Sequence, residues 1–99
     1  MKKIDFEGYH PDEQLEKIYY KTQGYCYICG KKLAYTNYGI LGEKASWIVE
    51  HKRPKSKGGS NNIRNLWPAC IKCNREKGDT YPYTFLYDYV DGEIVKLDE

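Results

Sequence analysis

The stretch CIKCNREKG, residues 70–78, decides how this chain can fold. Its two cysteines have the spacing of half a metal site, and an asparagine, Asn74, follows the second of them directly. A second pair with the same spacing lies in YCYICG, residues 25–30, where the closing glycine allows the backbone to fold back toward a metal ion. The chain therefore carries two halves of what can be one site.

The cysteine pairs predict a structural zinc site. The 40 residues between the pairs exceed the spacing of a compact zinc ribbon, but this is no obstacle if the pairs meet in space. Four thiolates complete the tetrahedral shell of Zn²⁺ and leave no position for water or substrate, so the ion would serve folding. Free buried cysteines and a redox-active pair are the alternatives; a thioredoxin-like protein would use one pair in a βαβ pattern, which is not visible here. The expected ligands are Cys26, Cys29, Cys70 and Cys73.

Length and charge suggest one small domain with a polyanionic partner. With 99 residues the chain buries a limited core, which often needs a staple such as a metal ion. The net charge of +2 hides an uneven distribution, because residues 44–77 hold nine Lys and Arg against two acids, while residues 78–99 hold one Lys against six. A charge run is often only a solvated surface, but this one coincides with the second cysteine pair. That coincidence favours a polyanion as the partner.

The N-terminal segment has no apolar leader, since Asp5 and Glu7 follow the first two lysines. No apolar run approaches the length of a membrane span. We therefore expect a cytoplasmic protein without membrane contact, in a compartment where structural disulfides are rare.

Residue patterns predict a strand, loop, strand and helix at the centre of the chain. A scaffold helix is expected at residues 11–23, where Leu15 and Ile18 have helical spacing. Further elements are a strand at 46–51, a turn-rich loop at 55–62, a short strand near 66–67, a helix from the second cysteine pair to Lys77, and a hairpin at 87–97 around an Asp-Gly turn. Residues 31–44 are expected to be a long connection, partly strand.

In this order, CYIC (26–29), VEHKRPKSKGG (49–59), NLWPAC (65–70) and CIKCNREKG (70–78) resemble the HNH endonuclease family. The resemblance covers residues 25–78. It implies an α+β fold, a small zinc-stabilised single domain in which a ββα-metal (His-Me finger) core with a flanking helix clasps one catalytic divalent ion. Residues 1–24 would then be an N-terminal extension and scaffold helix, and residues 79–99 a C-terminal segment with a hairpin in the same domain.

The resemblance also implies a role for each motif residue. His51 matches the general base, and Asn65 matches the asparagine that orients the base and its loop. Glu50 matches an acidic metal ligand that is usually Asp, and Asn74 matches a ligand that is His in many members, so this chain is an H-N-N variant. The residue types suit the chemistry, because histidine can take a proton from water near neutral pH. A carboxylate and an amide oxygen together suit Mg²⁺ or Mn²⁺.

Several alternatives stay open for these residues. Neighbouring strand residues point to opposite faces, so Glu50 and His51 cannot both face one site from a regular strand. A bend or bulge near Pro54, or the end of the strand, must bring them together. Glu50 could instead lie behind the ligands or form a salt bridge on the zinc side. A lone histidine is often structural, and asparagines often serve turns and caps. The only other histidine, His10, lies outside every motif.

The expected function is therefore a metal-dependent DNA endonuclease that hydrolyses phosphodiester bonds with a histidine base and one divalent cation. The alternative is a non-catalytic zinc module that binds nucleic acid. Double-stranded DNA is the expected partner, with protein partners in a larger DNA-processing complex, as the resemblance to phage and bacterial HNH proteins implies. The cations expected to contact phosphates are Lys52, Arg53, Lys55, Lys57, Arg75 and Lys77.

Overall fold

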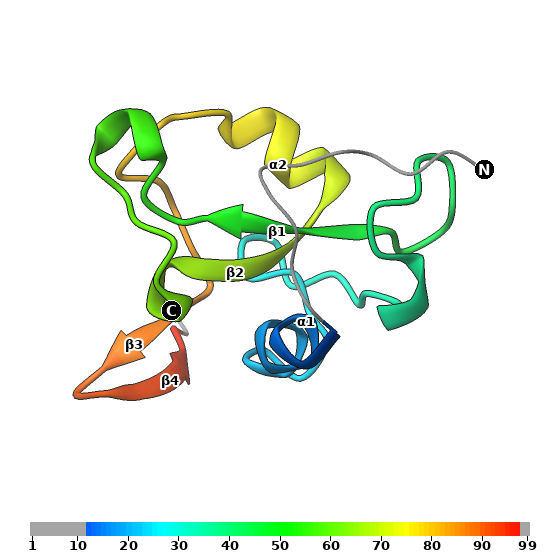
Figure 1. Ribbon diagram of the computed structural model, residues 1–99, viewed down its shortest axis with the longest axis horizontal. Helices are drawn as coiled ribbons and strands as arrows, with labels where there is room; N and C mark the ends of the chain where they lie inside the picture. Colours follow the sequence, from blue (N-terminus) through cyan, green and yellow to red (C-terminus); the bar gives the residue numbers. More distant parts are fainter. Residues whose placement is uncertain (1–11, 98–99) are drawn as a thin grey trace.

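Two antiparallel strands, β1 (Trp47–His51) and β2 (Leu66–Cys70), form the centre of the computed structural model, which describes residues 12–97. Their register places Glu50 opposite Trp67 and His51 opposite Leu66. Helices α1 and α2 lie on opposite sides of this pair (Figure 1). The strands are buried along nearly their whole length, which explains their continuous runs of apolar residues. The predicted strand, loop, strand and helix are confirmed.

Helix α1 (Asp12–Tyr20) packs Leu15, Ile18 and Tyr19 into the core. The negative charges of Asp12 and Glu13 in its first turn interact favourably with the positive end of the helix dipole. The helix ends three residues before the predicted position, because Gln23 and Gly24 adopt positive φ angles of 55° and 86° and the Gly24 N–H bonds the Tyr19 carbonyl at 3.0 Å. The predicted start at residue 11, the N-terminal extension before it and His10 lie outside the described residues.

Helix α2 (Ile71–Lys77) starts directly after β2 and lies against both central strands. Cys70 ends the strand and caps the helix, since its Sγ accepts a hydrogen bond from the Cys73 N–H at 3.4 Å. The Gly78 N–H bonds the Asn74 carbonyl at 3.0 Å and closes the last turn. The helix was predicted over this stretch, with the same closing glycine.

The connections hold three short 3₁₀ turns: η1 (Tyr35–Asn37), η2 (Lys55–Lys57) and η3 (Ile63–Asn65). The first occupies the long segment that we expected to be partly strand; no named strand forms there, and only single bridges such as Tyr38 to Trp47 occur. The other two lie in the loop between β1 and β2, so this loop has local structure of its own.

Strands β3 (Tyr87–Val90) and β4 (Glu93–Lys96) form the predicted C-terminal hairpin. Its turn residues Asp91 and Gly92 have φ angles of 53° and 82°, as the Asp-Gly signal requires. The hairpin is joined to the central sheet by the ring of Tyr89, 5.3 Å from Trp67, and by an ion pair between Lys52 and Asp88.

The core combines aliphatic and aromatic side chains, and Trp47, Trp67 and Tyr27 are its largest fully buried members. The Tyr27 ring stacks on Trp67 at 5.4 Å and on Phe85 at 5.2 Å. The buried Tyr19 hydroxyl finds a partner in the Leu33 carbonyl at 2.7 Å. These observations confirm a small α+β domain. Within residues 12–97, no helix has the length and apolar character needed to cross a bilayer.

Candidate functional site

The structure brings the two cysteine pairs together. The sulfur atoms of Cys26, Cys29, Cys70 and Cys73 all lie within 4.8 Å of one another, and those of Cys29 and Cys70 are 3.9 Å apart. A tetrahedral zinc ion with Zn–S bonds of about 2.3 Å places its sulfurs about 3.8 Å apart. The cluster therefore fits a four-thiolate zinc site, as predicted.

Two backbone N–H groups point at sulfur atoms of the cluster. The backbone N–H groups of Ile28 and Cys73 each donate to a sulfur at 3.4 Å, the first to Cys26 and the second to Cys70. The hydrogen bond between Cys26 and Cys70 lowers the pKa of Cys70 to about 4 and, together with burial, raises the pKa of Cys26. Burial and the hydrogen bond to Cys70 raise the pKa of Cys73. Backbone donors aimed at soft sulfur ligands are the support that a structural zinc site needs.

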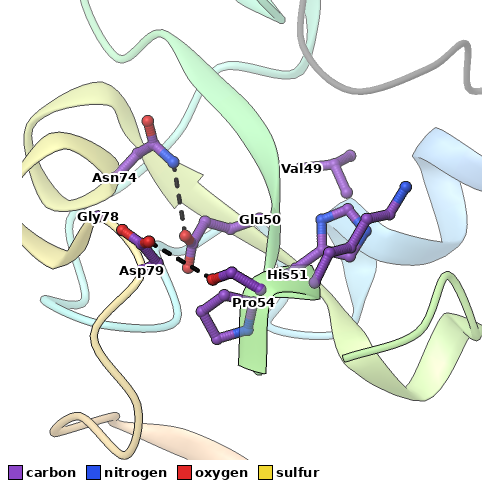
Figure 2. Close-up of a pocket in the computed structure, with 9 residues that line it drawn as sticks. Val49, Glu50, His51, Pro54, Asn74, Gly78 and Asp79 are labelled. Carbon is purple, nitrogen blue, oxygen red and sulfur yellow. Dashed lines mark hydrogen bonds between the residues drawn. The ribbon is translucent and has the colours of Figure 1, made fainter. Parts of the chain in front are cut away.

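A cleft of about 360 Å³ lies between β1, turn η2 and the end of α2 (Figure 2). Its walls combine two acids, a histidine, an amide and a lysine with small and apolar groups. The lining residues are Val49, Glu50, His51, Pro54, Lys55, Ser56, Asn74, Gly78 and Asp79.

The carboxylate of Glu50 is buried, with 5% of the residue exposed, and its two oxygens have different partners. Oε1 accepts a hydrogen bond from the Tyr27 hydroxyl at 2.5 Å and lies 3.5 Å from the Lys77 ammonium. Oε2 accepts from Nδ2 of Asn74 at 3.5 Å, as Figure 2 shows. Burial raises the pKa of Glu50, and the Tyr27 hydrogen bond and the Lys77 charge offset part of that rise. Burial and the neighbouring carboxylate also raise the pKa of Tyr27, so its hydroxyl keeps the proton that it donates.

His51 ends strand β1 and lines the same cleft from a different direction. Figure 2 shows the Glu50 carboxylate pointing toward Asn74, whereas the His51 side chain lies on the other side of the strand. No bulge redirects either residue, so the ordinary alternation of strand side chains separates them. The imidazole Nε2 is 2.8 Å from Oδ1 of Asn61, an exposed residue that sequence reasoning placed only in a turn-rich loop.

The side-chain amide of Asn65 forms hydrogen bonds with the backbone of the loop. Nδ2 donates to the carbonyls of Arg53 at 3.0 Å and Ser60 at 2.8 Å, and Oδ1 accepts from the Arg53 N–H at 2.8 Å. Asn65 thus binds the loop backbone, while the asparagine that contacts the His51 ring is Asn61. Both side chains come from one connection, because the loop folds back on the end of β1.

Asp79 is a further cleft residue that sequence reasoning missed. It follows the glycine that closes α2, and its Oδ2 accepts a hydrogen bond from the Ser56 hydroxyl at 3.4 Å. An acid next to a helix-closing glycine carries no signal of its own in a single sequence.

The cations expected to contact phosphates do not form one surface. Lys77 is 1% exposed, so its ammonium faces Glu50 and the interior, and a direct phosphate contact does not fit this placement. Lys52 pairs with Asp88 and has a side chain only 13% exposed. Arg53 bonds the Lys57 carbonyl at 2.7 Å and lies over the Tyr81 ring. The remaining expected cations, Lys55, Lys57 and Arg75, are exposed.

These observations define a small α+β domain with a four-cysteine cluster that could hold a metal ion and a separate cleft lined by acid, histidine and amide groups. The sequence model of the HNH endonuclease family matches residues 26–80, which contain all four cysteines and every cleft residue. The match covers more than half of the 99 residues, so the chain belongs to the HNH endonuclease family. No curated protein and no solved structure matches the chain.

Proposed function

We propose that the protein is a metal-dependent DNA endonuclease whose chemistry takes place in the cleft between β1 and α2. The observation that carries this proposal is the approach of Glu50 and Asn74, 3.5 Å apart, at the wall of a cleft that His51 also lines. Members of the HNH family act on DNA, and this group of side chains supplies what phosphodiester hydrolysis requires.

Glu50 and Asn74 are the residues that would hold the catalytic cation. Oε1 of Glu50 is engaged by Tyr27 and Lys77, which leaves Oε2 toward the cleft. The Asn74 amide must turn about its Cβ–Cγ bond, because Nδ2 now faces Oε2 and only the amide oxygen can serve as a ligand. Few protein oxygens with room for water suit Mg²⁺ or Mn²⁺. Such an ion would supply charge stabilisation at the scissile phosphate and the departing oxygen.

His51 would act as the general base through Nδ1. With Oδ1 of Asn61 as the acceptor at 2.8 Å, Nε2 carries the proton of the neutral ring and Nδ1 keeps the lone pair. An in-line displacement has the attacking water and the departing oxygen on opposite sides of phosphorus. His51 and Glu50 line one cleft from different directions, which suits that requirement. The family resemblance implies products with a 5′ phosphate and a 3′ hydroxyl.

Contacts to the DNA backbone are proposed for exposed cations around α2. Lys31, Lys72 and Arg75 line a second pocket of about 210 Å³ on the zinc side of the helix. Within residues 12–97 none of these three forms an ion pair, in contrast to Lys52 and Lys77. With Lys55 and Lys57 near the cleft, they could neutralise phosphates without reading sequence.

Plasmid cleavage with Mg²⁺ or Mn²⁺ tests the proposal directly. The zinc-loaded wild type should cleave only with an added divalent cation, and His51→Ala should lower the rate at least about 100-fold, the usual contribution of a general base. Zinc content and circular dichroism should be equal in both proteins. Equal cleavage rates would reject His51 as the base.

The second candidate is a non-catalytic zinc module that binds nucleic acid. It is favoured by one observation: Glu50 already has the partners Tyr27 and Lys77, as a purely structural buried carboxylate would. This candidate predicts DNA binding without cleavage under any divalent cation, and no binding of Mn²⁺ beyond the zinc site.

A further inference from the structure

We infer that Tyr27 and Lys77 are positioning residues that hold Oε1 of Glu50 and thereby present Oε2 to the catalytic cation. The inference rests on the proposed function, because it assigns Glu50 as a cation ligand. It adds a direct connection between the zinc site and the cleft, since Tyr27 follows the zinc ligand Cys26 in the chain.

Tyr27 is held on several sides, so its hydroxyl has a fixed position. The residue is fully buried, with its ring stacked between Trp67 and Phe85. Its N–H donates to the Pro68 carbonyl at 2.9 Å, and its carbonyl accepts from the Leu86 N–H at 2.8 Å. The Tyr27 hydroxyl therefore reaches Glu50 from a framework formed by the zinc knuckle, β2 and the C-terminal segment.

Lys77 reaches the same oxygen from helix α2. Its side chain is 0% exposed, and its Nζ lies 3.5 Å from Oε1 of Glu50 and 3.3 Å from the carbonyl oxygen of His51. A buried ammonium is tolerated only where it is paired and hydrogen-bonded, and these two contacts meet that need. One cation thus contacts the acid and the backbone of the residue proposed as base.

Two donors on one oxygen restrict rotation of the carboxylate. A ligand that is fixed before the ion arrives loses less conformational freedom on binding, which increases affinity. Because Tyr27 and Lys77 both contact Oε1, the restriction leaves the oxygen next to Asn74 for the ion.

Tyr27→Phe tests this role, with Tyr19→Phe as the matched control. Both variants delete a buried hydroxyl that donates one hydrogen bond, to Glu50 in the first case and to the Leu33 carbonyl in the second. Binding of Mn²⁺ to the zinc-loaded protein without DNA is measured by isothermal titration calorimetry. The dissociation constant should rise about tenfold in Tyr27→Phe, in line with a lost hydrogen bond to a charged group. It should stay within about twofold in Tyr19→Phe, although both variants lose stability.

Cleavage gives a second readout. The Tyr27→Phe variant should need more cation for half-maximal rate but should recover most of the wild-type rate at saturating cation, which a general loss of structure would not allow. Lys77→Met, which keeps the buried aliphatic volume, should shift Mn²⁺ affinity in the same direction. If Tyr27→Phe fails to retain zinc, the Mn²⁺ affinity of Lys77→Met replaces it as the test of the positioning role.

The outcomes separate this inference from the proposed function. Equal Mn²⁺ affinities in Tyr27→Phe, Lys77→Met and wild type, with affinity lost in Glu50→Gln, would overturn the positioning role and leave Glu50 as a ligand. A wild-type protein that binds no Mn²⁺, or a Glu50→Gln variant that binds it as tightly as wild type, would overturn both.

Discussion

Replacement of Asn65 by aspartate tests how the loop between β1 and β2 is held. The two side chains have the same shape, but aspartate has no donor. The bond from the Arg53 N–H at 2.8 Å would persist, whereas the carbonyls of Arg53 and Ser60 would each face a carboxylate oxygen across about 3 Å. The substitution thus changes hydrogen-bond polarity with little change in volume.

The expected cost follows from these three contacts. Each lost hydrogen bond accounts for about 0.5–1.5 kcal/mol, so two account for about 1–3 kcal/mol. Repulsion between the carboxylate and two carbonyl oxygens adds about 1 kcal/mol, a modest value because the site is partly exposed and water screens the charge. The free energy of unfolding should therefore fall by about 2–4 kcal/mol at pH 7.

Asn62→Asp is the matched control, three residues earlier in the same loop. Oδ1 of Asn62 only accepts, from the Arg64 N–H at 2.9 Å, so aspartate can take over its role as cap of η3. Urea unfolding of the zinc-loaded proteins measures the loss in each variant. Equal losses in the two variants would refute this account of the loop.

Three further outcomes can be measured on the same protein. Removal of zinc by a chelator should unfold the domain reversibly. The binding free energy of structural zinc is about 10–16 kcal/mol, whereas the total unfolding free energy of a small domain is about 5–15 kcal/mol. An unchanged near-ultraviolet circular dichroism spectrum after chelation would contradict this. Gly59→Ala should lower the free energy of unfolding by about 3 kcal/mol, because the new Cβ would lie 1.7 Å from the Arg53 carbonyl oxygen. At Gly42 a Cβ would meet no atom within 4 Å, so Gly42→Ala should lower it by only about 1 kcal/mol, the cost of the positive φ. Similar melting temperatures in the two variants would refute the steric argument. Burial, with repulsion from two neighbouring cations, lowers the pKa of Lys21 from 10.5 to about 7. Above pH 7 the unfolded chain therefore binds a proton that the folded chain has released, so the free energy of unfolding should rise with pH. The expected rise is about 1 kcal/mol after allowance for solvent screening. Parallel pH profiles of stability in wild type and Lys21→Met would refute this.

The sequence predicted the elements whose signals are local. Apolar spacing, the Asp-Gly turn at Asp91 and the glycine after Lys77 each act within a few residues, and the structure follows them closely. The cluster of four cysteines was also predictable, because two like pairs in such a chain are typical of a shared metal site. The family assignment followed from the order of these same motifs.

The partners of the motif residues were not predictable, because they depend on contacts between distant segments. Nothing near Glu50 in the chain indicates that Tyr27 and Lys77 meet on one of its oxygens, since they lie 23 residues before it and 27 after it. Lys77 was expected to meet phosphate because it is a lysine in a basic segment, and only the packing of α2 shows that it is buried. Asn61 was similarly hidden among turn residues.

The stacking of Phe85 on Tyr27 affects how far the chain can be truncated without disturbing the cleft. A chain shortened to residues 26–80 would keep every cysteine and the whole lining of the cleft. It would also lack the Phe85 ring and the Leu86 amide that fix Tyr27, so one face of the phenol beside Glu50 would be open to water. The homologous segment therefore leaves out residues that hold Tyr27, and we expect a chain reduced to that segment to have a less ordered Glu50 carboxylate.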